Sequence, residues 1–209
     1  MNYWFTGDTH WYHKNIIKHA KRPFALDDIS SMNEALIEAW NIVVNPGDVV
    51  YHVGDFAWTD SVDLVEELIK QLNGQIHIVY GNHDRKGVRK ATGFASARDY
   101  KEIKIPIGND EKQVICLFHY SCRVWNKSHH GSWHLYGHSH DSLAPNLATK
   151  SFDVGVDAIA RRFAIKAGRE TLDYHDFRPI NFDEVAEIMK EHRWWKPIDH
   201  HKEKSDEKV

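Results

Sequence analysis

Five short segments of this sequence contain most of the residues that could bind metal ions. They are residues 7–10 (Gly-Asp-Thr-His), 54–55 (Gly-Asp), 81–84 (Gly-Asn-His-Asp), His119, and 137–140 (Gly-His-Ser-His). Together they supply these oxygen and nitrogen donors: Asp8, His10, Asp55, Asn82, His119, His138 and His140. A single Asp or His at a strand end is more often a turn or packing residue. Five compatible segments in this order predict a site for two adjacent divalent metal ions.

The types of donor narrow the choice of metal. Carboxylates, one amide and several imidazoles suit Mn²⁺, with iron, Zn²⁺, Ni²⁺ or Co²⁺ as alternatives, and argue against Mg²⁺ or Ca²⁺ alone. Structural zinc sites are typically closed and rich in cysteine, so the absence of a thiolate argues against one. Asp8 and His10 are two residues apart and within reach of one ion. The two oxygens of a carboxylate can bridge two cations, which makes Asp55 the natural shared ligand.

The elements that position these residues alternate between strand and helix in the first half of the chain. Short apolar strands separated by helices are typical of a covered, largely parallel sheet. The expected strands here are residues 3–6, 48–53 and 76–80, and the expected helices are 13–20, 27–44 and 61–72. In the second half we expect strands at 100–105, 113–118, 133–136 and 151–156, and a last helix whose capping box is Asn181 and Glu184. The donor residues follow strand ends, where α/β sheets usually place their chemistry.

Length and composition favour one globular domain. At 209 residues we expect a single domain over residues 1–194, followed by a charged, disordered tail over residues 195–209. The net charge of −3 gives no global basic field that would attract nucleic acid. Cys116 and Cys122 cannot form a disulfide framework, and the sequence has neither a signal peptide nor an apolar run long enough to span a membrane. We therefore expect a cytoplasmic protein with no membrane partner; the oligomeric state is open.

The ordered motifs resemble the calcineurin-like metallophosphoesterase superfamily. Its pattern is Asp-x-His, Gly-Asp, Gly-Asn-His-Asp or Glu, a lone His, and Gly-His-x-His, which matches residues 3–157 here. The resemblance implies an α/β fold, a four-layer αββα sandwich of two mixed β-sheets flanked by helices. It also implies a two-metal site, in which Asp8, His10 and His140 hold one ion and Asn82, His119 and His138 hold the other, with Asp55 shared by both.

The same resemblance implies a hydrolytic mechanism. A metal-activated hydroxide attacks phosphorus, and the counterpart of His83 protonates the leaving group. Many phosphoprotein phosphatases continue the second motif as Gly-Asp-x-x-Asp-Arg-Gly, whereas residues 54–60 read Gly-Asp-Phe-Ala-Trp-Thr-Asp. Trp58 therefore replaces the Asp that would orient the catalytic histidine, and a Ser/Thr protein phosphatase is not expected. Asp84 and a backbone carbonyl are the alternative partners that could orient His83.

Substrate contacts are the least specified part of the prediction. Arg85 directly follows the third motif, and the run Asp-Thr-His…His-Lys-Asn…Arg-Pro-Phe resembles a small branch of bacterial and phage phosphoesterases, so we expect Arg22 and Arg85 to bind phosphate. Four aromatic residues could either stack on a base or aryl leaving group or pack in the core: Trp11, Trp58, Tyr120 and Trp125.

The predicted function is hydrolysis of phosphodiesters, phosphomonoesters or both, in small nucleotide-like substrates. A nuclease that uses the basic tract at residues 85–90 is the alternative, and a non-catalytic scaffold of the same fold is less favoured.

Overall fold

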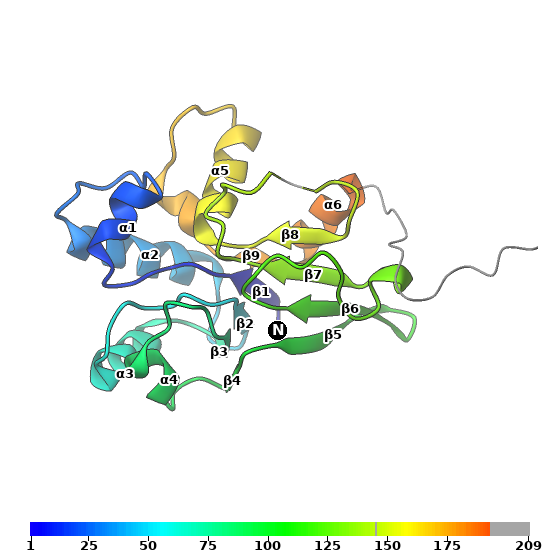
Figure 1. Ribbon diagram of the computed structural model, residues 1–209, viewed down its shortest axis with the longest axis horizontal. Coiled ribbons are helices and arrows are strands. Elements are labelled where there is room, and N and C mark those ends of the chain that lie inside the picture. The colour runs from blue at the N-terminus through cyan, green and yellow to red at the C-terminus, as the bar shows by residue number, and fades with distance from the viewer. Residues whose placement is uncertain (145, 193–209) are drawn as a thin grey trace, which may run out of the picture.

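Two mixed β-sheets form the centre of the fold. The computed structural model describes residues 1–144 and 146–192. The first sheet has the strand order β4-β3-β2-β1-β9, and the second has the order β5-β6-β7-β8. The predicted α/β class with two mixed sheets and flanking helices is confirmed (Figure 1). The tail expected at residues 195–209 lies outside the described residues.

The first sheet is parallel except at one edge. Its strands are β1 (Tyr3–Thr6), β2 (Val49–His52), β3 (Gln75–Val79), β4 (Ser96–Arg98) and β9 (Ile180–Asn181). β1 pairs in parallel with β2, β2 with β3 and β3 with β4, whereas β9 pairs with β1 in the antiparallel direction. The carboxyl ends of β1, β2 and β3 therefore meet at one edge, as the sequence predicted.

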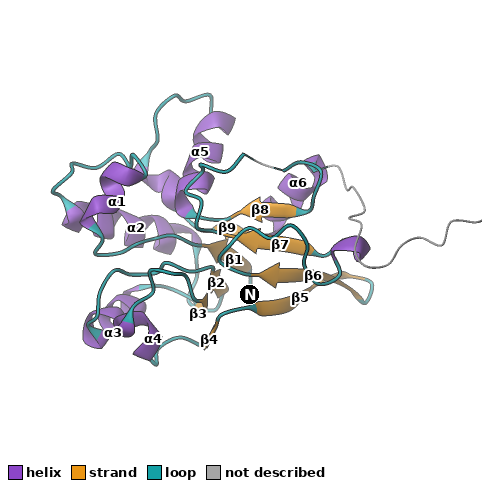
Figure 2. Cartoon of the chain, in the orientation of Figure 1, coloured by secondary structure: helices purple, strands orange, loops and turns teal. Residues whose placement is uncertain are grey.

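The second sheet begins with a hairpin and continues in parallel. β5 (Lys101–Gly108) pairs antiparallel with β6 (Glu111–Leu117), and β6, β7 (Trp133–Tyr136) and β8 (Ser151–Asp153) are parallel neighbours. The strand expected over 151–156 is too long, because Gly155 serves as the N-cap of helix α5, which starts at Val156. The loops that follow β6 and β7 extend on the same side as those that follow β1 to β3 (Figure 2).

Helices cover the first sheet and one end of the sandwich. α1 (Lys14–His19), α2 (Ile29–Val43), α3 (Val62–Gln71) and α4 (Lys86–Lys90) gather at the left of Figure 1, and α5 (Val156–Lys166) and α6 (Phe182–Glu191) lie along its top. Short 3₁₀ turns occupy Ser128–His130 and Tyr174–Phe177. The capping box predicted from Asn181 and Glu184 is present at the start of α6.

Alternation along the strands divides the core into two clusters. Trp4 and Val50 face the cluster that contains the apolar faces of α2 and α3, whereas Phe5 and Tyr51 face a second cluster with residues of β5 to β8. Successive strand residues point to opposite faces of a sheet, so β1 and β2 contact both layers. Both faces of these strands are buried, which fixes the position of the loops that follow them.

Candidate metal centre

The loops at the strand ends bring the predicted ligands together from both sheets. In the described residues, Asp8, His10 and His140 form one group whose ligand atoms lie within 4.8 Å of one another, and Asp55, His119 and His138 form a second. Asp8 and His10 follow β1 and Asp55 follows β2, whereas His119 follows β6 and both His138 and His140 follow β7. Asn82, after β3, belongs beside the second group, because its Oδ1 lies 3.0 Å from His119 Nε2.

Asp55 lies between the two groups. Its Oδ2 is 3.4 Å from His10 Nε2 in one group and 3.4 Å from His119 Nε2 in the other. Its Oδ1 instead accepts a hydrogen bond from the His83 backbone N–H at 2.7 Å. One oxygen of this carboxylate is thus anchored by the backbone while the other faces both groups, as expected of a shared ligand.

Several buried atoms at this point have the chemistry of metal ligands. Asp8 Oδ1, His10 Nε2 and Asp55 Oδ2 are buried and have no hydrogen-bond partner among residues 1–144 and 146–192. Buried polar atoms are rarely left unpaired in native proteins, so three in one place need an explanation. Divalent cations bound by these nitrogen and oxygen atoms would satisfy all three. The residues present therefore fit a two-metal site.

Hydrogen bonds on the far side of two imidazoles fix which nitrogen faces the centre. His119 Nδ1 lies 2.9 Å from the Val53 carbonyl, and His140 Nδ1 lies 2.7 Å from Asp157 Oδ2. Each Nδ1 must donate its proton to these acceptors, which leaves Nε2 unprotonated in the neutral ring and available as a ligand. Metal-binding histidines commonly have an oxygen partner of this kind.

Burial and close mutual contacts shift the pKa values of the ionisable groups in this cluster. Burial raises the pKa of Asp8 to about 7, and burial lowers the pKa of His10 to about 4. Burial also disfavours charge on His119, but the close Asp55 carboxylate and the Asp8 carboxylate outweigh that effect and raise its pKa to about 9. Burial acts to raise the pKa of Asp55, but the close imidazoles of His10 and His119 outweigh it, so the pKa of Asp55 is lowered. A bound cation would favour the ionised carboxylates and neutral imidazoles.

Arg22 is buried beneath the site. Its Nε and Nη2 donate to the two carboxylate oxygens of Asp157 at 2.8 and 2.9 Å. Nη2 also donates to the Asp8 carbonyl at 2.6 Å, and Nη1 donates to the Thr9 carbonyl at 2.8 Å. The Arg22 side chain is 0% exposed. This arrangement does not support the phosphate contact expected from the sequence. Arg22 instead stabilises the first loop, which follows β1 and contains Asp8 and Thr9.

Asp84 also supports the backbone rather than His83. Its carboxylate accepts hydrogen bonds from the backbone N–H groups of Asp55, Phe56 and Gly81. Burial raises the pKa of Asp84 to about 6, although these N–H groups act in the opposite direction. Both oxygens are engaged by backbone of the turns after β2 and β3, so Asp84 is not the partner that orients the His83 imidazole.

His83 and Arg85 lie on the accessible side of the centre. Asn82 and His138 are exposed and His83 is half-buried, whereas Asp8, His10, Asp55 and His119 are buried. The Arg85 guanidinium is 4.1 Å from the centre of the Trp58 ring and 3.8 Å from Asp60 Oδ2, and its side chain is 46% exposed. Its placement leaves it accessible to a substrate, unlike Arg22.

The other aromatic residues divide between core and surface. Trp11 is fully buried, and Trp125 donates to Ser132 and packs beside His134, so neither is placed to stack on a substrate. Tyr120 is 40% exposed and its ring lies 4.6 Å from that of His138. It borders an open cavity of about 370 Å³ next to His138.

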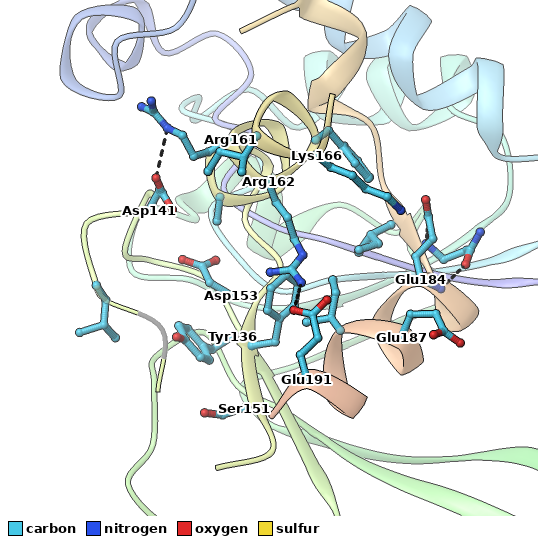
Figure 3. A pocket seen from close by; sticks show the side chains of 18 of the residues that line it. Tyr136, Asp141, Ser151, Asp153, Arg161, Arg162, Lys166, Glu184, Glu187 and Glu191 are labelled. Carbon is cyan, nitrogen blue, oxygen red and sulfur yellow. Dashed lines mark hydrogen bonds and ion pairs between the residues drawn. The ribbon is translucent and has the colours of Figure 1, made fainter. Parts of the chain in front are cut away.

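A larger cavity is lined by other residues than the predicted ligands. It measures about 650 Å³ and is lined by α5, α6 and β8 (Figure 3). Its arginines are paired within the chain, Arg161 with Asp141 at 3.3 Å and Arg162 with Glu191 at 2.7 Å. The predicted ligands do not line it, so the cavity is not the candidate site.

The sequence did not indicate the residues that support the ligands. Asp157 joins His140 to Arg22, and His13 Nδ1 lies 3.2 Å from His10 Nδ1. The position of Asp157 shortly after the fifth ligand segment gave no spacing signal, and its partner Arg22 is 135 positions away. For His13, its position three residues after His10 was the sequence signal that could have indicated such a role.

Comparison with known proteins identifies a matching family and relatives. A model of the calcineurin-like phosphoesterase family matches residues 1–209. An uncharacterized protein of Methanocaldococcus jannaschii is 27% identical over 190 residues, covering 88% of this chain and 89% of that protein. The gene 66 protein of mycobacterium phage L5 is 25% identical over 186 residues, covering 77% of this chain and 88% of that protein.

A solved structure shares the fold. The crystal structure of a protein of unknown function from Aquifex aeolicus matches with a TM-score of 0.61 and 20% identity, covering 90% of this chain and 98% of that one.

Within residues 1–144 and 146–192, no helix is long and apolar enough to cross a membrane.

Proposed function

Because this chain belongs to the calcineurin-like phosphoesterase family, we propose that it is a phosphoric ester hydrolase that uses two divalent metal ions. The observation that carries the proposal is the position of Asp55 Oδ2, 3.4 Å from a nitrogen of each ligand group and without a hydrogen-bond partner in the part of the chain described. Asp8, His10 and His140 would hold one ion, and Asn82, His119 and His138 the other, with Asp55 on both.

When bound, two such cations neutralise phosphate charge and lower the pKa of a water molecule towards neutrality. In hydrolysis the water oxygen forms a new bond to phosphorus and the bond from phosphorus to the leaving oxygen breaks. His83 would donate a proton to that oxygen, since it is half-buried and adjacent to the ligand Asn82. A positioned acid of this kind contributes about 10²–10⁴-fold to the rate. Arg85, exposed beside Trp58, would contact the phosphate or the leaving group.

Small nucleotide-like esters, diesters or monoesters, are the proposed substrates, and Mn²⁺ is the proposed metal. The open side of the centre and the net charge of −3 support small substrates over a polyanion. In the tract at residues 85–90, Arg89 donates to the Asp84 carbonyl and lies over the Tyr80 ring, so it is not a free phosphate contact. A nuclease therefore remains the second choice. The cytoplasmic location expected from the sequence is part of the same proposal.

The test uses protein stripped of metal by a chelator. We expect hydrolysis of bis(4-nitrophenyl) phosphate or 4-nitrophenyl phosphate to return when Mn²⁺ is added, with two equivalents of Mn²⁺ bound per chain by calorimetry. Asp55→Asn should lose both binding and activity, because it removes a charged ligand facing both groups. Asp110→Asn, in the exposed β5–β6 turn, is the matched control. No turnover with any of the proposed metals would overturn the enzyme assignment, and full activity of Asp55→Asn would overturn the site.

A further inference from the structure

The His83 imidazole is surrounded by rings rather than by a carboxylate. Its ring centre lies 5.1 Å from that of Trp58, at an interplanar angle of 49°, and 5.5 Å from that of His10. No hydrogen bond or ion pair links the imidazole to any other residue within the described ranges. The backbone of His83 is nevertheless fixed, since its N–H donates to Asp55 Oδ1. The orientation of the ring must therefore come from packing.

The nearby carboxylates are committed elsewhere. Asp84 accepts three backbone N–H groups, and Asp55 Oδ2 faces the two ligand histidines. Asp60 has a side chain that is 65% exposed and lies 3.8 Å from Arg85. None of these three is left to orient the His83 imidazole, so Trp58 is the large neighbour available for that task.

The Trp58 indole is itself firmly held. The His13 ring stacks on it at 4.4 Å with an interplanar angle of 11°, and the Arg85 guanidinium lies 4.1 Å from its centre. The Trp58 backbone N–H donates to the Trp11 carbonyl at 2.8 Å, and this bond links the Trp58 backbone to the first loop. Aromatic stacking and cation–π contacts of this kind are attractive and favour this position of the ring. The indole therefore has a fixed position beside the His83 ring.

We propose that Trp58 is a positioning residue for His83, holding the imidazole by ring contact so that its proton points at the leaving oxygen. The proposal rests on the proposed function of His83 as proton donor. A carboxylate partner would both orient an imidazole and stabilise its charged form, whereas an indole edge or face mainly restricts its rotation. The contribution of Trp58 should therefore appear only when the leaving group needs a proton.

The experiment compares two ethyl aryl phosphates that differ only in the leaving group. The 4-nitrophenolate leaves without a proton, whereas 4-methoxyphenolate is more basic and depends on the acid. Trp58→Ala should lower kcat on the 4-methoxyphenyl ester by about 10–100-fold, part of the value of a general acid, with little change on the 4-nitrophenyl ester. KM should change little on either. Trp58→Phe, which keeps a ring against His83, should restore most of kcat.

A double-mutant cycle identifies the residue through which Trp58 acts. Once His83 is alanine, removing Trp58 should cost nothing further on the 4-methoxyphenyl ester, because the two residues act as a unit. Trp125→Ala controls for loss of an indole, since Trp125 packs on His134 instead. Equal losses on both esters, additive losses in the cycle, or an effect on KM alone would overturn the proposal.

A second measurement does not depend on activity. In the wild type, the NMR signal of His83 Cε1–H should carry a ring-current shift from Trp58, and this shift should disappear in Trp58→Ala while Mn²⁺ binding is retained. An unchanged His83 signal would refute the contact even if the enzyme is active. Absence of metal-dependent turnover in the wild type would instead refute the proposed function, while a lost ring-current shift would still support the packing of His83 on Trp58.

Discussion

Replacing Arg22 with alanine tests whether its guanidinium supports the fold or contacts the substrate. The sequence indicated a phosphate contact, and the structure places the side chain at 0% exposure beneath the first loop. We expect Arg22→Ala to lower the free energy of unfolding and to weaken metal binding, with little effect on KM once metal is saturating. The two roles therefore predict different measurements from one variant.

The size of the effect follows from the contacts that would be lost. Arg22 makes two hydrogen bonds to Asp157, at 2.8 and 2.9 Å, and donates to the carbonyls of Asp8 and Thr9. Removing one partner of a buried ion pair costs about 3–5 kcal/mol, because the other charge stays buried without compensation. Total stabilities are about 5–15 kcal/mol, so the variant should remain folded under mild conditions but be clearly weakened.

Loss of Arg22 should also lower the metal affinity of the site. Asp157 would be left holding His140 Nδ1 without its counter-charge, and the Asp8 carbonyl would lose its donor. Removing the partner behind a metal-binding histidine typically lowers metal affinity by about 10–100-fold. Arg22→Lys keeps the charge but cannot reproduce the planar fork, so we expect an intermediate loss of stability.

Urea unfolding in chelator measures the stability change, and Mn²⁺ titration measures affinity. Arg161→Ala is the matched control, since Arg161 lies at the surface 3.3 Å from Asp141 and such pairs contribute about 0–1 kcal/mol. If Arg22→Ala left the free energy of unfolding unchanged and raised KM for 4-nitrophenyl phosphate at saturating Mn²⁺, the structural role would be wrong and the phosphate contact right.

Three further predictions concern stability. Mn²⁺ at 100 times its Kd should raise the free energy of unfolding of the wild type by about 2.7 kcal/mol, and a similar gain in Asp55→Asn by calorimetric melting would contradict the shared-ligand role. Asp84→Ala should cost at least about 1–3 kcal/mol because it leaves buried backbone N–H groups unpaired; chemical unfolding within error of the wild type would count against this. Burial raises the pKa of Asp48, but hydrogen bonds from the Asn2 N–H and the Trp4 indole outweigh it and lower the pKa to about 2. A depressed pKa stabilises the fold above about pH 4, and this effect is lost as the pH falls towards 2. Asp48→Asn should therefore be about 2 kcal/mol less stable than the wild type at pH 7, and urea unfolding should show this difference in stability narrowing by pH 3. A difference in stability that does not depend on pH would refute the assignment.

The sequence was informative where chemistry is local. A ligand residue directly after an apolar strand needs only the strand to be placed correctly, and β1, β2, β3, β6 and β7 all formed close to their predicted ranges. Because parallel strands end at one edge, the residues that follow β1, β2 and β3 were expected to lie together, whereas the approach of the second sheet was implied by the family resemblance. The capping box of Asn181 and Glu184 depends on neighbours within a few residues, and it was predicted equally well, whereas helix α5 was not predicted.

The sequence was uninformative where a role depends on a distant partner. The expectation that Arg22 binds phosphate rests on the run of residues around it, which resembles a branch of phosphoesterases. The actual partner of Arg22, Asp157, is 135 residues away and fell just after a run read as a continuing strand. The same limit applies to Trp58: its spacing showed that a carboxylate was missing, but only the structure places His13 and Arg85 against its ring.

Backbone conformation explains why the ligand loops need such support. Many of the proposed ligands have positive φ: Asp8 at 52°, His10 at 52°, Asp55 at 55°, His138 at 71° and His140 at 45°. Non-glycine residues in this region cost about 1–3 kcal/mol each and persist only where the surroundings determine them. The loops achieve this by binding one another, as the Asp8 N–H donates to the Gly54 carbonyl and the His138 N–H donates to Asp8 Oδ2. A Cβ on Gly81 would approach Asp55 Oδ1 to 2.2 Å, so glycine is required where the loops touch. The strain is local, but the hydrogen bonds that maintain it join both sheets, and for that reason Arg22, Asp84 and Asp157 support the candidate metal centre although none of them is a proposed ligand.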